Sequence, residues 1–216
     1  MKKVSKSLSF VVMTLLMVSL LASPGFSGIK FGVKGGFSLA NLAFDPEPTD
    51  NPLENKTGAV GGFSMNLRLS RVFSLQPEIL YVQKGTKITI TEGEGEITGK
   101  LNVDYLEIPL LLNISFAKEG SSFVPSVFAG PYVGLNTRAK IKSSYDGESY
   151  SEDFKDSVKD TDFGLAFGVG LGMKVGSGKI VLDVRYDLGL TNVADGMDEG
   201  GSVKNRAWLF MLGYCF

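Results

Sequence analysis

Apolar and polar residues alternate with a period of two along most of the chain. The clearest run covers residues 161–175, where Phe163, Leu165, Phe167 and every second residue after them are apolar, with glycines and charged residues between them. This alternation predicts a β-strand whose two faces lie in different surroundings. The pattern recurs and predicts eight strands, over residues 29–40, 58–69, 73–87, 102–116, 125–142, 161–175, 179–190 and 207–216.

The connections between these strands alternate between short and long. Short turns fall near residues 70–71, 117–122 and 176–178, whereas long loops span 41–57, 88–99, 143–160 and 192–205. Short turns at one end and long loops at the other are typical of outer-membrane barrels. The predicted fold class is therefore all-β, an eight-stranded antiparallel up-and-down transmembrane β-barrel.

The direction of the apolar face distinguishes this barrel from the alternative, a soluble, lipocalin-like periplasmic binding barrel. Such a barrel would turn its apolar face inward. Here the non-apolar face is rich in glycine and carries both signs of charge, which suits a narrow lumen in which charges pair. We expect a structural charge network in the lumen, formed by Lys30, Lys34, Arg68, Glu78, Glu107, Arg138, Lys174, Asp183, Arg185 and Asp187. The apolar face, with Trp208 and Tyr214 near opposite ends of the last strand, then meets lipid.

Four prolines lie within or beside the predicted strands: Pro77, Pro109, Pro125 and Pro131. Proline cannot donate to a strand ladder and is normally confined to edges, strand starts and bulges. Because the alternation also blurs near Pro77 and Pro109, we expect β-bulges at these two positions.

The N-terminus has the three parts of a secretory signal. A short basic segment with three lysines precedes an apolar stretch over residues 8–22, and small residues follow up to Ser27. That stretch is shorter than the roughly 20 residues of a membrane-spanning helix, so an uncleaved anchor is the weaker alternative. We expect a signal peptide over residues 1–27 and an outer-membrane β-barrel domain over residues 28–216.

Composition narrows the candidate chemistry. The 216 residues include 22 Lys and Arg against 23 Asp and Glu, which gives nucleic acid no electrostatic attraction. The chain has no His, which excludes Ser-His-Asp and Cys-His catalysis and His-ligated zinc. Its single cysteine, Cys215, excludes an internal disulfide. We expect no catalytic residue, cofactor or metal; an enzyme that uses only carboxylates on lipid or peptide is the alternative.

Several segments carry a resemblance to a known family. Gly35-Gly36, LQPEILY at 75–81, YLEIPL at 105–110, FAGPY at 128–132 and the glycine-rich strand at 168–172 resemble the PorT-type outer-membrane β-barrel family, common in Bacteroidetes. The resemblance covers essentially the whole mature chain. It implies a barrel and an outer-membrane location but no single activity, although PorT itself is associated with type IX secretion.

The last strand ends in aromatic residues that resemble the terminal signal by which outer-membrane proteins reach the barrel-assembly machinery. The residues of this expected signal are Trp208, Phe210, Tyr214 and Phe216. Recognition by that machinery is what the resemblance implies for them.

The predicted function is a structural or interaction role through the long surface loops, each of which carries net negative charge. Eight strands enclose a lumen that side chains fill, so a narrow porin-like channel is the weaker alternative, beside an accessory role in secretion. An acidic rim could hold divalent cations, but the spacing of Asp195, Asp198 and Glu199 matches no EF-hand. Expected partners are outer-membrane lipid, the assembly machinery and an extracellular or secretion-system protein, with no nucleic acid; we expect a monomer.

Overall fold

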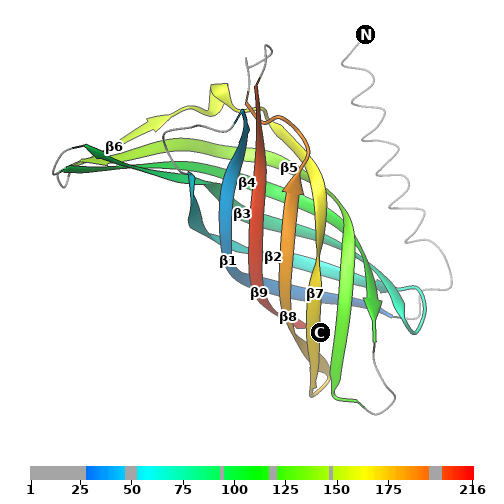
Figure 1. Ribbon diagram of the computed structural model, residues 1–216. Coiled ribbons are helices and arrows are strands. Elements are labelled where there is room, and N and C mark those ends of the chain that lie inside the picture. Colours follow the sequence, from blue (N-terminus) through cyan, green and yellow to red (C-terminus); the bar gives the residue numbers. More distant parts are fainter. Residues whose placement is uncertain (1–27, 47–52, 93–94, 117–120, 146–147, 195–200) are drawn as a thin grey trace, which may run out of the picture.

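The computed structural model describes residues 28–46, 53–92, 95–116, 121–145, 148–194 and 201–216 (Figure 1). The predicted signal peptide over residues 1–27 lies outside these ranges, as do parts of all four predicted long loops. The boundary between signal peptide and barrel domain therefore stays a prediction. No helix within the described ranges is long and apolar enough to cross a membrane.

The described residues form nine strands in one antiparallel sheet that closes on itself. The strands are β1 (Ile29–Asp45), β2 (Leu53–Arg68), β3 (Phe73–Glu92), β4 (Gly95–Ser115), β5 (Phe123–Tyr145), β6 (Glu148–Asp153), β7 (Thr161–Val175), β8 (Gly178–Gly189) and β9 (Ser202–Cys215). The order is β4-β3-β2-β1-β9-β8-β7-β5, and the β4–β5 pairing closes an eight-stranded barrel, with β6 added at the end of β5. The predicted fold class is confirmed.

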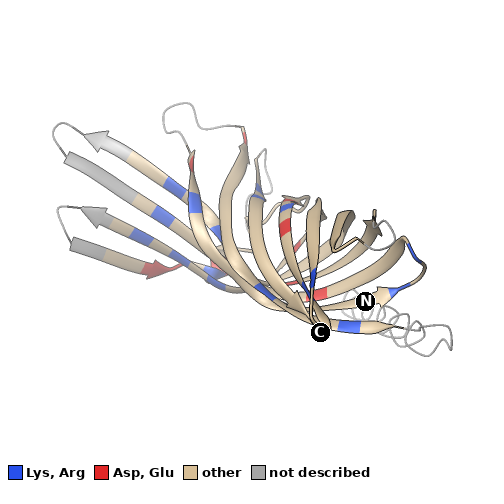
Figure 2. Cartoon of the chain, turned by 90° about the horizontal axis from the view of Figure 1, so that it is seen from below, with Lys and Arg blue, Asp and Glu red and all other residues tan. Residues whose placement is uncertain are grey.

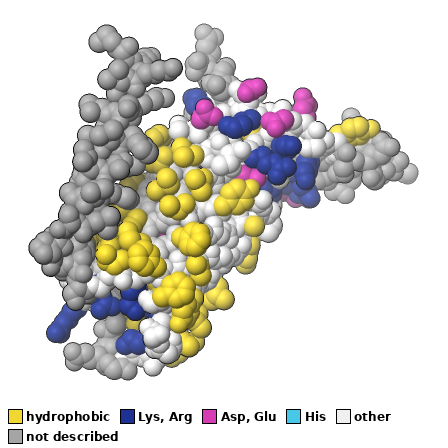
Figure 3. All heavy atoms as spheres, turned by 180° about the vertical axis from the view of Figure 1, so that it is seen from behind, with side chains coloured by type: hydrophobic (Ala, Val, Ile, Leu, Met, Phe, Trp, Pro, Cys, Tyr) yellow, Lys and Arg dark blue, Asp and Glu magenta, His cyan; other side chains and the backbone are white. Residues whose placement is uncertain are grey.

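The two faces of the barrel wall lie as the alternation predicts. On β7, Phe163 is 52% exposed and Val169 is 55% exposed, whereas Asp162 is fully buried at 0%. Apolar side chains gather in a broad area on the outer surface (Figure 3). This arrangement is the reverse of a soluble barrel that surrounds a ligand with its apolar face.

Glycines on the inner face of β7 make room for large side chains from neighbouring strands. A Cβ atom at Gly164 would collide with the ring of Tyr132, and one at Gly170 would lie 2.8 Å from both Asp183 Oδ1 and Ser126 Oγ. The glycine-rich face therefore lines the lumen as predicted. Its glycines leave the space that larger side chains of the neighbouring strands occupy.

Strands occupy most of the predicted loop over 88–99 and half of the one over 143–160, so the expected strand ends are wrong there. β3 and β4 continue to a hairpin in which Glu92 pairs with Gly95, and β5 continues to Tyr145 and pairs with β6. Residues 87–92, 95–100, 140–145 and 148–153 form a four-stranded extension, which we call the arm, and it leans away from the barrel axis (Figure 1). The alternation gives only weak support for strands in the arm, because Ile88, Ile90, Ile97 and Ile141 are scattered among Thr, Ser, Gly, Glu and Lys residues.

The bulges expected at Pro77 and Pro109 are absent from the ladders. Pro77 pairs with Leu110 and Leu80 with Glu107 in one unchanged register, although the ladder is interrupted between them. A proline without an N–H thus breaks the hydrogen bonding without inserting a residue.

The described ladders shift register elsewhere. One shift lies between Asn55 and Val60 on β2. In the other, Asp104 pairs with Arg138 and Tyr105 with Asn136, so Thr137 is an extra residue on β5. A single extra residue moves every later side chain of that strand to the opposite face.

Candidate functional site

The barrel interior is organised around Arg185 of β8, which is fully buried. Its Nη1 donates to Glu78 Oε2 at 2.9 Å and its Nη2 to Glu107 Oε2 at 3.4 Å. The same guanidinium binds Asp187, with Nε 2.9 Å from Oδ1 and Nη2 3.1 Å from Oδ2. The planar fork of arginine suits such a position because it can serve several carboxylates at once.

Two lysines extend this network on opposite sides of Arg185. Lys34 of β1 lies with its Nζ 2.7 Å from both Glu78 and Asp183. Lys84 of β3 pairs with Glu107, lies 3.8 Å from Asp187 and sits 4.6 Å from the centre of the Tyr132 ring.

These four carboxylates and three cations form one continuous chain of ion pairs that joins β1, β3, β4 and β8. Buried charges are costly unless opposite charges and hydrogen bonds compensate them, so each group holds its neighbours in place. The network thus occupies the lumen as a rigid plug.

A layer of tyrosine and amide side chains lies next to the network, toward the end with the long connections. Tyr132 donates its hydroxyl proton to Asp162 at 3.2 Å. Asn205 Nδ2 donates to the same Asp162 oxygen and to the Tyr105 hydroxyl, each at 3.0 Å. All four residues are buried, and they join β4, β5, β7 and β9.

Two apolar clusters lie beside this layer, toward the same end of the barrel. Phe154, just before the short helix η1 (Lys155–Ser157), packs against a cluster of Val103, Tyr105, Ala139 and Val158. A second cluster contains Leu42, Val193 and Val203. The segments meet where the Lys159 amide donates to the Val193 carbonyl at 2.8 Å.

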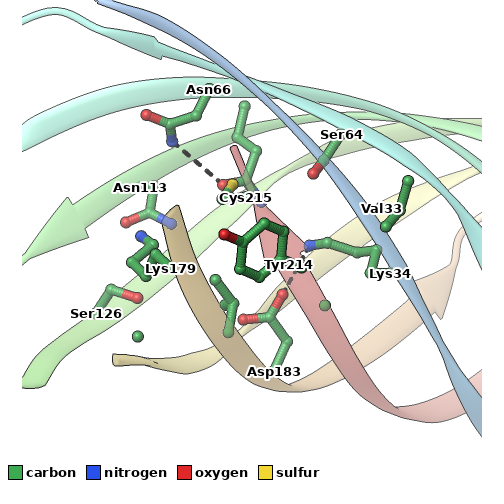
Figure 4. A pocket seen from close by; sticks show the side chains of 14 residues that line it. Val33, Lys34, Ser64, Asn66, Asn113, Ser126, Lys179, Asp183, Tyr214 and Cys215 are labelled. Carbon is green, nitrogen blue, oxygen red and sulfur yellow. Dashed lines mark hydrogen bonds and ion pairs between the residues drawn. The ribbon is translucent and has the colours of Figure 1, made fainter. Parts of the chain in front are cut away.

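A small polar cavity lies at the opposite end, beside the end of β9 (Figure 4). Its volume is about 20 Å³, and Lys34, Asp183, Asn66, Asn113 and Lys179 are among its lining residues. A cavity of this size holds about one water molecule. The space ends at the Lys34–Asp183 ion pair, so the plug begins there.

The structure brings only part of the predicted lumen set together. The network contains Lys34, Glu78, Glu107, Asp183, Arg185 and Asp187. Pairing places Lys30, Arg68 and Lys174 at the turn end of the barrel, opposite Asn66, Ser74 and Lys179, and none of them has an ion pair within the described residues.

Arg138 lies outside the lumen, and its predicted inward position is wrong. The extra residue Thr137 reverses the alternation of β5, so Ala139 is buried and Arg138 is exposed. Conversely, sequence reasoning missed Lys84, which has the same parity as Glu78, Leu80 and Val82, all buried. The period-two spacing from Glu78 to Lys84 could have placed Lys84 on the lumen face. The apolar residues Leu80 and Val82 between these two charged residues obscured that pattern.

The aromatic residues of the expected assembly signal lie along the last strand. Trp208 is 47% exposed, and its ring centre lies 4.9 Å from that of Tyr186. Phe210 stacks on Phe37 at 5.0 Å, and Tyr214 meets Phe216 edge-on at 5.4 Å. Their role in assembly stays a prediction.

Within the described ranges, no group of three or more His, Cys, Asp or Glu side chains is placed to hold a metal ion. The loop carboxylates Asp195, Asp198 and Glu199 lie outside the described residues. Calcium binding by that loop is therefore left as a sequence-level hypothesis.

Comparison with known proteins gives one family match and several structural likenesses. The model of the outer membrane protein beta-barrel domain matches residues 21–195. A search of curated protein sequences gives no match. Among solved structures, Neisserial surface protein A has 13% identity and a TM-score of 0.47, over 88% of this chain and 98% of that one.

Two further structures are similar at the same level. The attachment invasion locus protein Ail of Yersinia pestis has 17% identity and a TM-score of 0.42, over 87% of this chain and 98% of that one. The outer membrane protease OmpT of Escherichia coli has 12% identity and a TM-score of 0.48, over 89% and 97%. The family assignment rests on the sequence match and not on these likenesses.

Proposed function

Because the chain belongs to the outer membrane protein beta-barrel domain family, we propose that it is a non-enzymatic, non-conducting outer-membrane protein that binds a partner at the cell surface. The short turns, the start of β1 and the end of β9 lie at one end of the barrel. In such barrels this is the periplasmic end, so the arm lies outside the cell. The PorT-type subgroup and its link to secretion stay predictions.

The arm is the observation that carries this proposal. In the arm, β3, β4 and β5 continue beyond the barrel wall, and the short strand β6 is added to them. Within the described residues, β6 pairs with β5 alone. Such an edge strand presents backbone groups that can pair with another chain. Tyr150 on β6 is 67% exposed and adds an aromatic contact surface.

The sealed interior supports the same proposal. Transport would need a continuous water path, whereas ion pairs and apolar clusters fill the described lumen. Catalysis inside the barrel would need a carboxylate that substrate can reach, whereas Glu78, Glu107 and Asp187 are buried and held by cations. The surface is then the part of the molecule left to act.

Site-specific photocrosslinking on intact cells tests the proposal. A photoreactive residue would replace Tyr150 on the arm and, as a matched control, Phe63 on the lipid-facing wall, which is 68% exposed. We expect a discrete protein adduct at position 150 and lipid adducts only at position 63. The same protein adduct at both positions, or no protein adduct at position 150, would contradict a surface interaction role.

A further inference from the structure

The outer face of the arm carries a row of lysines that the described carboxylates only partly neutralise. Lys87 of β3 pairs in register with Lys100 of β4, and Lys100 pairs in register with Lys142 of β5. Paired residues on adjacent antiparallel strands point to the same face, about 5 Å apart. Like charges directly opposite each other are unfavourable, so this row calls for an anion.

The register shift on β5 adds to this row. Because Thr137 is an extra residue, Arg138, Lys140 and Lys142 all turn to the outer face instead of the lumen. Arg138 pairs in register with Asp104 and Lys140 with Asn102, directly below Lys142 and Lys100. We call Lys87, Lys100, Arg138, Lys140 and Lys142 the basic patch; bands of Lys and Arg recur on neighbouring strands there (Figure 2).

Protein carboxylates neutralise only part of the basic patch. Glu54 pairs with Lys87 at 3.1 Å, and Asp104 accepts a hydrogen bond from the Tyr81 hydroxyl at 2.6 Å. Within the described residues, no carboxylate lies within 4 Å of Lys100 or Lys142, and both of these lysines are exposed. Their positive charge is therefore presented to the surroundings.

The basic patch lies above the lipid-facing wall, at the level where the membrane surface is expected. It continues the lipid-facing wall, where the last apolar residues below it on that face are Tyr81, Leu106 and Leu135. Arg138 follows Leu135 within about 10 Å of chain, and Lys100 lies about 20 Å along β4 from Leu106. A basic area borders the apolar area on this side of the molecule (Figure 3). Because the arm leans away from the barrel axis, its outer face turns toward the membrane surface (Figure 1).

We propose that the basic patch binds the phosphate groups of lipids in the outer leaflet, with Lys100 and Lys142 as the main contacts. Lysines next to a membrane attract anionic headgroups, and the apolar wall below the patch would hold the acyl chains of the same lipid. The site lies on the outer face of β3, β4 and β5 and not on the edge strand β6, so it is independent of the proposed surface interaction.

The test compares three full-length proteins refolded into phosphatidylcholine vesicles, with or without diphosphorylated lipid A. They are the wild type, K100Q/K142Q, and K30Q/K174Q, which removes the same charge at the periplasmic rim. Lipid A retained by the protein after detergent extraction gives an apparent affinity. We expect binding by the wild type and by K30Q/K174Q, and about tenfold weaker binding by K100Q/K142Q.

Additional arms distinguish the sources of phosphate. Dephosphorylated lipid A should bind no better to the wild type than to K100Q/K142Q, and high salt should weaken only the phosphorylated form. Three results would each overturn the proposal. They are an equal loss of lipid A binding in both double variants, no binding by the wild type, and equally strong binding of soluble inorganic phosphate or a sulfated polysaccharide. Equal heat stability of the three proteins in pure phosphatidylcholine shows that folding is intact.

Discussion

Replacement of Arg185 by methionine tests the ionic plug most severely. Arg185 is fully buried and bonds to Glu78, Glu107 and Asp187 at 2.9–3.4 Å. Methionine keeps much of the side-chain volume but removes the charge, so Lys34 and Lys84 are the cations that remain beside these three carboxylates among the described residues. Removal of one partner from a buried ion pair costs about 3–5 kcal/mol, and we expect R185M to lose that much free energy of unfolding.

Urea titration in phosphatidylcholine vesicles measures this loss. Trp208 is the single tryptophan and faces the lipid, so its fluorescence reports on the inserted barrel. The matched control is R68M, because Arg68 is exposed and has no ion pair among the described residues; a change within about 0.5 kcal/mol is expected. In R185M/E107Q the two losses should be less than additive, since one orphaned carboxylate is removed. A loss in R185M no larger than in R68M would refute the plug.

Three further predictions concern the wall and the layer above the plug. Gly164→Val should prevent the heat-sensitive compact form seen on unboiled gels, because any Cβ there collides with the Tyr132 ring, whereas Val169→Leu on the outer face should keep it. Phe167→Arg should lower the free energy of unfolding in vesicles by about 2–4 kcal/mol, since it places a charge in the lipid-facing band; an unchanged value would mean that this face does not meet lipid. Tyr132→Phe should cost about 1 kcal/mol in the same titration, because it removes the 3.2 Å hydrogen bond to Asp162; no change at all would show that this bond does not form.

Period-two alternation predicts the barrel well where one face is apolar. It gives the eight barrel strands and the outward direction of Phe163, Phe167 and Val169 because lipid and lumen select different residues at successive positions. It also predicts much of the ion-pair network, since Lys34, Glu78 and Arg185 fall on the lumen face of their strands.

The alternation fails where that contrast is lost. β6 contains one aromatic residue among polar ones, so backbone pairing with β5 holds it and side-chain pattern does not reveal it. The extra residue Thr137 cannot be recognised from the neighbouring residues alone, and it carries Arg138 from the predicted lumen to the outer wall. Lys84 was missed because Leu80 and Val82 make the lumen face of β3 partly apolar.

Conductance of the purified wild-type barrel in planar lipid bilayers tests the central claim most directly. If the interior is closed by the Arg185 network and by the apolar clusters toward the end with the long connections, insertion should leave the membrane without resolved current steps. Steady, ion-selective steps from the wild type would contradict a closed barrel and would make transport, and not surface binding, the function to pursue.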